Sequence, residues 1–346
     1  MTDTGFDAFL LLSFGGPQGP DEVMPFLRNV TAGRGIPDER LAEVATHYQH
    51  FGGISPITEQ NEVLLAAIGA EFSRRGIELP LYFGNRNWHP LIADTTRQLA
   101  AAGHRNVLVL ATSATGSYSG CRQYREDLAG ALAANPDAGV TFTKLRHYFD
   151  HPGFIEANAA AVHRALNELP AEVRDEARLV FTAHSIPVSM NDSAGPSGGL
   201  YLAEHRETAR LVAEAVRGAG AEFDLVWQSR SGPPRVPWLE PDINDHLRTL
   251  SSDGVRAVVV APSGFVSDHL EVKWDLDEEA RETAVELGLG FVRAATAGVD
   301  PAFVSGLVDL VAEQLSGEPA RSLGELGICG WQCAANCCPA PARRPA

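Results

Sequence analysis

Eight short apolar segments alternate with segments of helical character along almost the whole chain, and this alternation constrains the fold most strongly. The apolar segments are 9–14, 79–84, 106–111, 141–145, 178–183, 223–228, 256–261 and 290–294. Segments such as 9–14 (FLLLSF) and 106–111 (NVLVLA) are nearly continuously apolar, which is typical of strands buried on both faces of a parallel sheet. Strands that alternate with helices predict an α/β fold with doubly wound parallel sheets.

Between these strands the sequence predicts helices, and the clearest is 57–75, which Pro56 opens and Gly76 closes. Further helices are predicted at 21–27, 90–102, 123–134, 153–168, 202–218, 268–287 and 301–315. The segment 28–56 has weak periodicity but contains aromatic residues, so we expect an irregular segment that forms the lip of a site.

The order of the elements predicts two similar α/β domains that face each other across a cleft. We expect the first domain at 1–115, with the lip at 28–56, and the second at 116–321. Over 322–346 the composition changes to a cysteine-rich tail with no helical stripe and little to bury. A segment of this kind stays disordered unless it binds a ligand.

Charge and hydropathy exclude several classes of protein. The net charge of −16 argues against a nucleic-acid partner and against binding anionic lipid through the general surface. No apolar run approaches the length of about 18 residues that a membrane span requires. The segment 9–14 ends too soon for a signal peptide. We therefore expect a cytoplasmic protein.

The segment 180–190 (VFTAHSIPVSM) brings one histidine, His184, to the carboxyl end of a predicted strand. Ser185 and Pro187 then favour a turn. Ligands of open α/β sheets bind at this edge, and an imidazole there is a candidate acid, base or metal ligand. The simpler interpretation is a histidine that is hydrogen-bonded within a loop.

Three carboxylates follow the strand 256–261 at a spacing of four residues: Glu271, Asp275 and Glu279. On a helix they form one acidic row, whose mutual repulsion is relieved by cations or protons. Carboxylate oxygens suit hard divalent cations. A capping box from Asp268 to Glu271 is a simpler explanation, but it accounts for only the first carboxylate.

Glycines and arginines add two candidate binding features. Gly52 and Gly53 allow a ligand to approach the backbone closely, and Ser55 with Pro56 begins a helix whose N-terminus is suited to an anion. Arginines in two loop regions are candidates for binding carboxylates. They are Arg28, Arg34, Arg40, Arg122 and Arg125. Taken singly, each feature fits an ordinary loop or a solvated surface charge as well.

In combination these segments resemble the ferrochelatase family, and specifically its bacterial class that acts on coproporphyrin. The matching segments are LLLSFGGP, FLRNVTAGRGIP, HYQHFGGISPIT, FTAHSIP and SGFVSDHLEVKWD, and the resemblance runs from about Phe9 to Leu310. It implies the two-domain, Rossmann-like chelatase fold with the porphyrin in the cleft. It also implies that His184 is the catalytic histidine and Glu271 its acidic partner, with both as candidate ligands of Fe²⁺. Asp275 and Glu279 would continue an acidic track to an outer cation site.

The resemblance implies insertion of Fe²⁺ into coproporphyrin III, which gives Fe-coproporphyrin III (coproheme) in haem biosynthesis. A charged lip suits the four carboxylates of coproporphyrin III better than it suits protoporphyrin IX. The expected porphyrin-binding residues are Phe14, Arg28, Arg34, Ser55 and Tyr124. Phe14 stands where some bacterial relatives carry tyrosine, which excludes a phenolate metal ligand at that position. The implied partners are the haem-pathway enzymes that supply the porphyrin or receive coproheme.

The cysteines indicate a cofactor. Cys121 stands alone, whereas four other cysteines lie in the tail, and clustered cysteines in a reducing cytosol indicate metal binding. Some ferrochelatases hold a [2Fe–2S] cluster with one internal and three C-terminal cysteines, which implies Cys121, Cys333, Cys337 and Cys338 as ligands here. Cys329 is the alternative ligand in the tail, and structural zinc takes the same side chains.

Other functions stay open. A protoporphyrin IX ferrochelatase has the same catalytic residues. Cobalt and nickel chelatases of this fold generally have a second histidine in place of Glu271. A non-catalytic haem or porphyrin carrier, or an iron–sulfur redox sensor, needs neither a proton acceptor such as His184 nor the acidic row.

Overall fold

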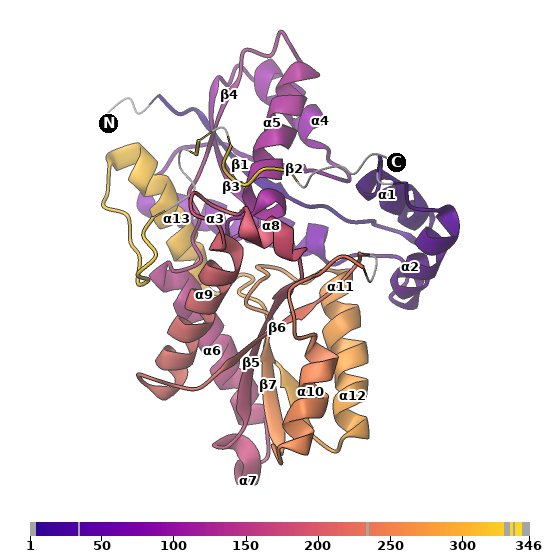
Figure 1. Cartoon of the computed structure of the whole chain (residues 1–346). Coiled ribbons are helices and arrows are strands. Elements are labelled where there is room, and N and C mark those ends of the chain that lie inside the picture. The colour runs from indigo at the N-terminus through magenta and orange to yellow at the C-terminus, as the bar shows by residue number, and fades with distance from the viewer. Residues whose placement is uncertain (1–4, 34, 233–234, 329–332, 335, 341–346) are drawn as a thin grey trace. The chain divides into compact units, whose positions relative to one another are not determined.

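The computed structural model describes residues 5–33, 35–232, 235–328, 333–334 and 336–340. The chain forms two compact units, and each contains one four-stranded parallel sheet (Figure 1). The first unit comprises Met1–Thr112, Arg125–Leu145 and Ser267–Trp274, and the second comprises Ser113–Tyr124, Arg146–Val266 and Asp275–Ala346. The α/β fold with parallel sheets is therefore confirmed.

The sheet of the first unit has the strand order β2-β1-β3-β4. Its strands are β1 (Ala8–Ser13), β2 (Leu81–Asn85), β3 (Asn106–Ala111) and β4 (Thr141–Lys144). All six residues of β1 are buried, as the continuous apolar run predicts for a strand with neighbours on both sides. The last residue pair between β1 and β2 is Ser13 and Asn85.

The helices of this sheet include α3 (Ile57–Arg75) and α4 (Ile92–Ala101), and both pack along β2. The bounds of α3 agree with the prediction, and Gly76 ends the helix in the left-handed conformation. Helix α5 (Gln123–Ala133) precedes β4.

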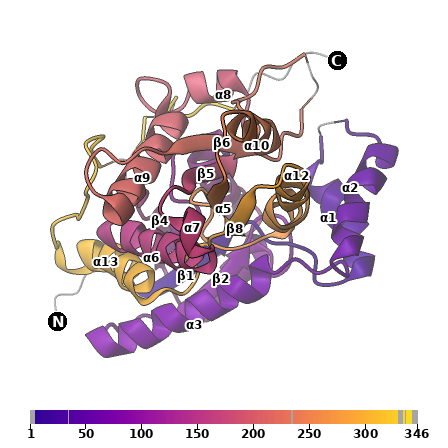
Figure 2. The same ribbon diagram turned by 90° about the horizontal axis from the view of Figure 1, so that it is seen from below.

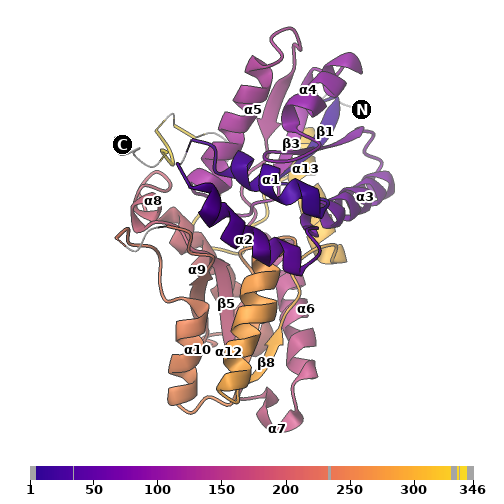
Figure 3. The ribbon, with the colours of Figure 1, turned by 90° about the vertical axis from the view of Figure 1, so that its right-hand side faces the viewer.

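Much of the lip is helical, so the prediction of an irregular segment over 28–56 was wrong for 38–50. Helix α1 (Val23–Val30) follows a 3₁₀ turn at Pro20–Glu22, and α2 (Asp38–His50) lies beside it (Figure 3). The buried stripe of α2 consists of only Leu41, Ala45 and Tyr48. Because this stripe is thin and the rest of the helix is polar, its period is hard to detect in the sequence.

The sheet of the second unit has the strand order β6-β5-β7-β8, which repeats the order of the first. Its strands are β5 (Arg178–His184), β6 (Asp224–Gln228), β7 (Ala257–Ala261) and β8 (Gly290–Arg293). The last residue pair between β5 and β6 is His184 and Gln228.

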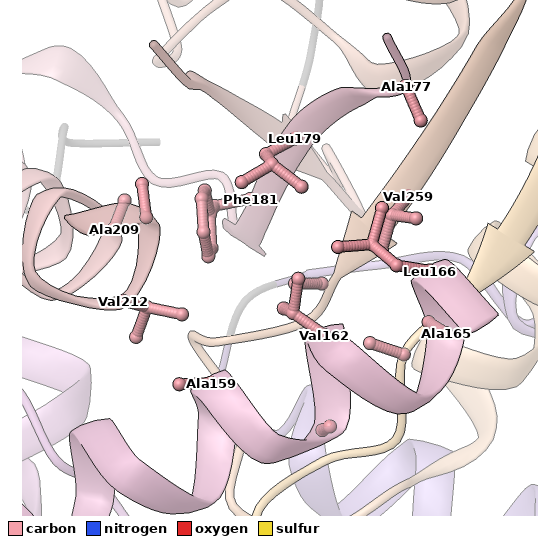
Figure 4. Packing of buried hydrophobic residues seen from close by; sticks show 14 of the residues in the cluster. Ala159, Val162, Ala165, Leu166, Ala177, Leu179, Phe181, Ala209, Val212 and Val259 are labelled. Carbon is pink, nitrogen blue, oxygen red and sulfur yellow. The ribbon is translucent and has the colours of Figure 1, made fainter. Parts of the chain in front are cut away.

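Helices cover both sides of this second sheet (Figure 2). Helices α6 (Pro152–Glu168) and α9 (Leu200–Arg217) pack Val162, Leu166 and Val212 against Leu179 and Phe181 of β5 (Figure 4). Helices α10 (Ile243–Ser252) and α12 (Arg281–Glu286) lie on the other side. Other helices are α7 (Ala171–Arg174), α8 (Val188–Asp192) and α13 (Pro301–Ser316), and α13 packs on α6. No helix in the described ranges is long and apolar enough to cross a membrane.

The units differ from the domains predicted at 1–115 and 116–321. Strand β4 pairs with β3, so it belongs to the first sheet although it follows residue 115. The segment Ser267–Trp274 also returns to the first unit, because α3 binds it. The Ser267 hydroxyl donates a hydrogen bond to Asn61 (3.0 Å), and the Asp268 amide donates one to Gln60 (2.8 Å). Glu271 is therefore part of the first unit, whereas His184 is part of the second.

Candidate active site

His184 is the last residue of β5, and the buried residues before it deliver it to the carboxyl edge of the sheet. Its side chain is half-buried, and its Nδ1 is hydrogen-bonded to the carbonyl oxygen of Ser185. A carbonyl oxygen only accepts, so Nδ1 carries the proton and the lone pair of the neutral imidazole lies on Nε2. In this tautomer Nε2 is able to accept a proton or to ligate a metal ion.

The backbone around His184 is held on several sides. The Tyr201 hydroxyl donates a hydrogen bond to the carbonyl oxygen of His184 (2.8 Å). The Ser185 amide donates to the carbonyl oxygen of Gln228 (2.8 Å), and the Ser185 hydroxyl donates to that of Leu239 (2.8 Å). These hydrogen bonds fix the backbone at His184 and Ser185, and so fix the direction in which the imidazole points from the end of β5.

Glu271 lies in the short helix α11 (Leu270–Val272), and 48% of its side chain is exposed. His269 is the N-cap residue of this helix, so the alternative explanation, a capping box that starts at Asp268, does not apply. Burial raises the pKa of the Tyr48 hydroxyl above its usual value, and the nearby Glu271 carboxylate raises it further. Glu271 is therefore close to the lip helix α2 within the first unit.

An aromatic stack joins the lip to the segment that carries Glu271, and the sequence analysis missed it. The His47 ring of α2 stacks on Trp274, with ring centroids 3.9 Å apart and planes 9° apart. His50 and Phe51 approach the same indole edge-on, with centroids at 5.6 and 6.5 Å. The lip helix is thus packed against the start of the acidic row.

The rest of the acidic row lies on a π-helix, η3 (Lys273–Ala280), between α11 and α12. The sequence predicted one continuous helix over 268–287, but a π-helix is wider than an α-helix, is rare and is frequent at functional sites. Asp275 accepts hydrogen bonds from Gln228 Nε2 (3.2 Å) and from the Ser229 hydroxyl. Glu279 is exposed and lines an open hollow of about 460 Å³ beside α10 and α12.

The residues expected to bind porphyrin have different surroundings. Phe14 is 37% exposed, and the Arg86 guanidinium lies 5.8 Å from its ring centroid. Ser55 and Tyr124 are buried. Arg28 is exposed and forms a salt bridge with Asp38 (2.6 Å), so it must exchange this partner to bind a ligand carboxylate. Arg34 lies outside the described residues.

Gly53, which was expected to let a ligand approach the backbone, packs against another part of the protein instead. Gly53 has a φ of +76°, and a Cβ at this position would lie 2.4 Å from Cα of Pro20. The expectation that Gly53 approaches a ligand is therefore replaced by a packing role beneath the lip. Pro56 is the N-cap residue of α3, and the Ser55 amide donates a hydrogen bond to Pro17 (2.8 Å).

Three of the five cysteines come together in the second unit. The sulfur atoms of Cys337 and Cys338 lie 3.8 Å apart, and the Gly195 amide donates a hydrogen bond to Cys338 Sγ (3.2 Å). The pKa of Cys338 is raised to about 12, mainly by burial and to a smaller extent by the nearby Cys337 and Cys121. Cys333 is half-buried, and Cys329 lies outside the described residues. In the described part of the chain, no three His, Cys, Asp or Glu side chains are arranged to hold a metal ion.

Gln228 and Ser229 were not predicted as site residues, although the sequence contained the signal. Gln228 ends the apolar segment DLVWQ in the same way that His184 ends its own strand. A polar side chain at the carboxyl end of a buried parallel strand is a candidate by the reasoning that identified His184. The contact of Gln228 with Asp275 depends on the path of η3, which the sequence does not reveal.

Comparison with known proteins identifies the family. The model of the ferrochelatase family, described as "Ferrochelatase", matches residues 6–315. A coproporphyrin III ferrochelatase of Nocardia farcinica is 57% identical over 348 residues, which cover 98% of each chain. One from Streptomyces coelicolor is 55% identical, covering 99% of this chain and 95% of its own, and one from Mycolicibacterium smegmatis is 58% identical, covering 91% and 92%.

A solved structure agrees with the fold. The chelatase SirB from Bacillus subtilis, determined with Fe³⁺, has a TM-score of 0.54 at 12% identity and covers 90% of this chain and 96% of its own. The family model spans most of the chain, and the relatives match both in sequence and in length. The chain belongs to the ferrochelatase family.

Proposed function

We propose that this protein inserts Fe²⁺ into coproporphyrin III and so produces coproheme for haem biosynthesis. The observation that carries the proposal is the match, at 55–58% identity over more than nine-tenths of the chain, to relatives that are named coproporphyrin III ferrochelatase. The charged lip helix supports the same substrate, because a macrocycle with four carboxylates is compatible with polar surroundings.

The reaction requires two steps that the residues of the site are suited to perform. Two pyrrole N–H protons must leave the macrocycle, and the iron must exchange its water ligands for the four nitrogens. His184 Nε2 and the Glu271 carboxylate are each able to accept a proton or to ligate the incoming iron. We assign these two tasks to this pair of residues and leave their division open.

The acidic row is proposed as the outer cation site. Asp275 and Glu279 offer hard oxygen ligands, which suit a hydrated divalent cation. Asp275 is oriented by two hydrogen bonds, whereas Glu279 is exposed. In this proposal the cation loses water in stages along the π-helix before it reaches the macrocycle.

A comparison of two porphyrins tests the substrate. Anaerobic Fe²⁺ insertion should be measured with coproporphyrin III and with protoporphyrin IX, and kcat/KM determined for each. We expect a clear preference for coproporphyrin III, which should decrease when Arg28 is changed to alanine if this arginine binds a propionate. Arg97→Ala, an exposed arginine of α4, is the matched control. Equal or faster turnover of protoporphyrin IX would refute the proposed substrate.

We also propose that Cys121, Cys333, Cys337 and Cys338 hold a [2Fe–2S] cluster, with Cys329 as the alternative to one of the tail ligands. The proximity of Cys337 and Cys338 and the electrostatic interaction of Cys121 with Cys338 support this set, because four thiolates are the ligands that such a cluster takes. The Gly195 amide is a donor to the sulfur of Cys338. When bound, the cluster would link the tail to Cys121 within the second unit and supply one-electron redox chemistry.

The cluster is tested by its spectrum and its composition. Protein purified without oxygen should absorb in the visible range and contain acid-labile sulfide, and Cys338→Ser should lose both. Ser119→Ala, a change in the short π-helix η2 (Tyr118–Arg122) that also contains Cys121, is the control that should keep both. A colourless protein that contains zinc and no sulfide would show instead that the cysteines form a structural zinc site.

A further inference from the structure

Gln228 connects the strand that carries His184 with the π-helix that carries Asp275. It is the last residue of β6 and pairs with His184 in the register of the sheet. Its side chain is 1% exposed. The Thr182 hydroxyl donates a hydrogen bond to its Oε1 (3.0 Å), and its Nε2 donates to Asp275 Oδ2 (3.2 Å).

The orientation of the Gln228 amide follows from its partners. A carboxylate oxygen only accepts, so the NH₂ group must face Asp275 and the carbonyl oxygen must face the Thr182 hydroxyl. Thr182 lies two residues before His184 on β5. The carbonyl oxygen of the Gln228 backbone also accepts a hydrogen bond from the Ser185 amide (2.8 Å). Gln228 therefore binds β5 on both sides of His184 and binds η3 at Asp275.

Ser229 adds a second donor to the same carboxylate. It has a φ of +61°, which is unusual for a residue other than glycine and is costly unless its surroundings compensate. Its hydroxyl donates a hydrogen bond to Asp275 Oδ2, the atom that Gln228 also contacts. Two donors from the end of β6 thus converge on one oxygen of Asp275.

We propose that Gln228 is a positioning residue for metal insertion, which holds the Asp275 carboxylate in a fixed relation to the strand that ends in His184. This inference rests on the proposed iron insertion. An amide is the side chain that this position requires, because it accepts from Thr182 and donates to Asp275 at once. A glutamate at this position has the same shape but places a second carboxylate beside that of Asp275. A leucine has neither a hydrogen-bond donor nor an acceptor.

The test compares Gln228→Leu and Gln228→Glu with Gln98→Glu, a change of the same chemistry on the exposed surface of α4. Partners that orient metal ligands typically contribute about 10- to 100-fold to metal affinity or activity. We expect both Gln228 variants to raise the KM for Fe²⁺ by about 10-fold or more and to leave the KM for porphyrin near the wild-type value. Because the variants remove buried hydrogen bonds, their midpoint of thermal unfolding should also fall, so the two KM values are measured well below that midpoint. Gln98→Glu should match the wild type in all three.

A double-mutant cycle separates positioning from general packing. If Gln228 acts through Asp275, Gln228→Leu should have little further effect in an Asp275→Asn background. Effects that multiply in the double variant, or an equal rise of the KM for Fe²⁺ and the KM for porphyrin, would overturn the inference. Mn²⁺ binding by the porphyrin-free protein, followed by electron paramagnetic resonance, gives a readout without turnover and should weaken about 10-fold in Gln228→Leu. A wild-type protein that binds Mn²⁺ but inserts no iron would refute the proposed function and leave this binding comparison intact.

Discussion

The two sheets share one strand order, yet their carboxyl edges end in different chemistry. The pair that ends β1 and β2 is Ser13 and Asn85, whereas the pair that ends β5 and β6 is His184 and Gln228. In the first sheet, α3 closes this edge: Asn61 Nδ2 donates a hydrogen bond to Ser13 Oγ (2.8 Å), and both Ser13 and Asn85 are fully buried. In the second sheet, β5 holds the place that β1 holds in the first, so His184 corresponds to Ser13. Unlike Ser13, His184 is only half-buried.

This difference shows how one architecture is used in two ways. In the first unit, the buried polar edge stabilises α3, and the same face of α3 holds the segment that carries Glu271 through Gln60 and Asn61. In the second unit, the edge itself carries the titratable group. The first unit therefore carries a carboxylate on the short helix α11, and the second carries an imidazole at the end of a strand.

The largest effect is expected from Glu271→Gln. The amide keeps the size of the side chain but removes its charge and its ability to accept a proton, so iron insertion should fall by about 100-fold or more. Glu62→Gln, an exposed position on α3 in the same unit, should have no effect on insertion. Anaerobic assays with coproporphyrin III measure both. If Glu271→Gln retains more than a tenth of wild-type activity, the Glu271 carboxylate of the first unit is not required for iron insertion.

A smaller effect, on stability, is expected from a buried histidine of the second unit. Burial lowers the pKa of His205 to about 3, and its ring lies against Tyr201, with centroids 4.3 Å apart. The unfolded chain binds a proton at this residue below about pH 6.5, and the folded chain does not. Stability that is present above pH 6.5 is therefore lost as the pH falls toward 3, at about 1.4 kcal/mol per pH unit.

The variant His205→Gln tests this pH dependence. Glutamine does not titrate, so the free energy of urea unfolding should decrease less between pH 7 and pH 5 than in the wild type, by about 2 kcal/mol. His163→Gln, an exposed position on α6, should follow the wild type. If all three proteins lose stability in parallel, burial of His205 is not the source of acid sensitivity.

The smallest effect on activity is expected at the edge of the first sheet. Ser13→Ala leaves Asn61 and Thr112 without the hydroxyl that they contact at 2.8 and 3.1 Å, so the free energy of unfolding should fall by about 1–3 kcal/mol. Insertion per folded molecule should stay near the wild-type rate. Urea unfolding and the iron assay on the same preparation measure the two. A loss of insertion without a loss of stability would show that this edge also takes part in the chemistry.

The strands were predictable because burial on both faces leaves a continuous apolar run, as in β1, β3 and β7. Helix α10 was overlooked, although Asp242 and the stripe of Ile243, Leu247 and Leu250 mark it. Helix α2 was harder to predict, since its N-cap residue, Pro37, provides no side-chain cap and its stripe contains only one aliphatic side chain larger than alanine, Leu41.

The site was predictable where a single residue type at a strand end carries the signal, as at His184. The π-helix was not, because the same acidic spacing fits an α-helix equally well. The assignment of Glu271 to the first unit was missed because it depends on the bonds of α3 with Ser267 and Asp268, which are more than 200 residues apart from it in sequence.

The most direct test of the account is anaerobic Fe²⁺ insertion into coproporphyrin III by the wild type, by His184→Ala and by the exposed control His163→Ala, with porphyrin binding measured in parallel by fluorescence. The account predicts that His184→Ala binds the porphyrin but inserts iron at least about 100-fold more slowly, whereas His163→Ala matches the wild type. Insertion by His184→Ala at the wild-type rate would contradict it.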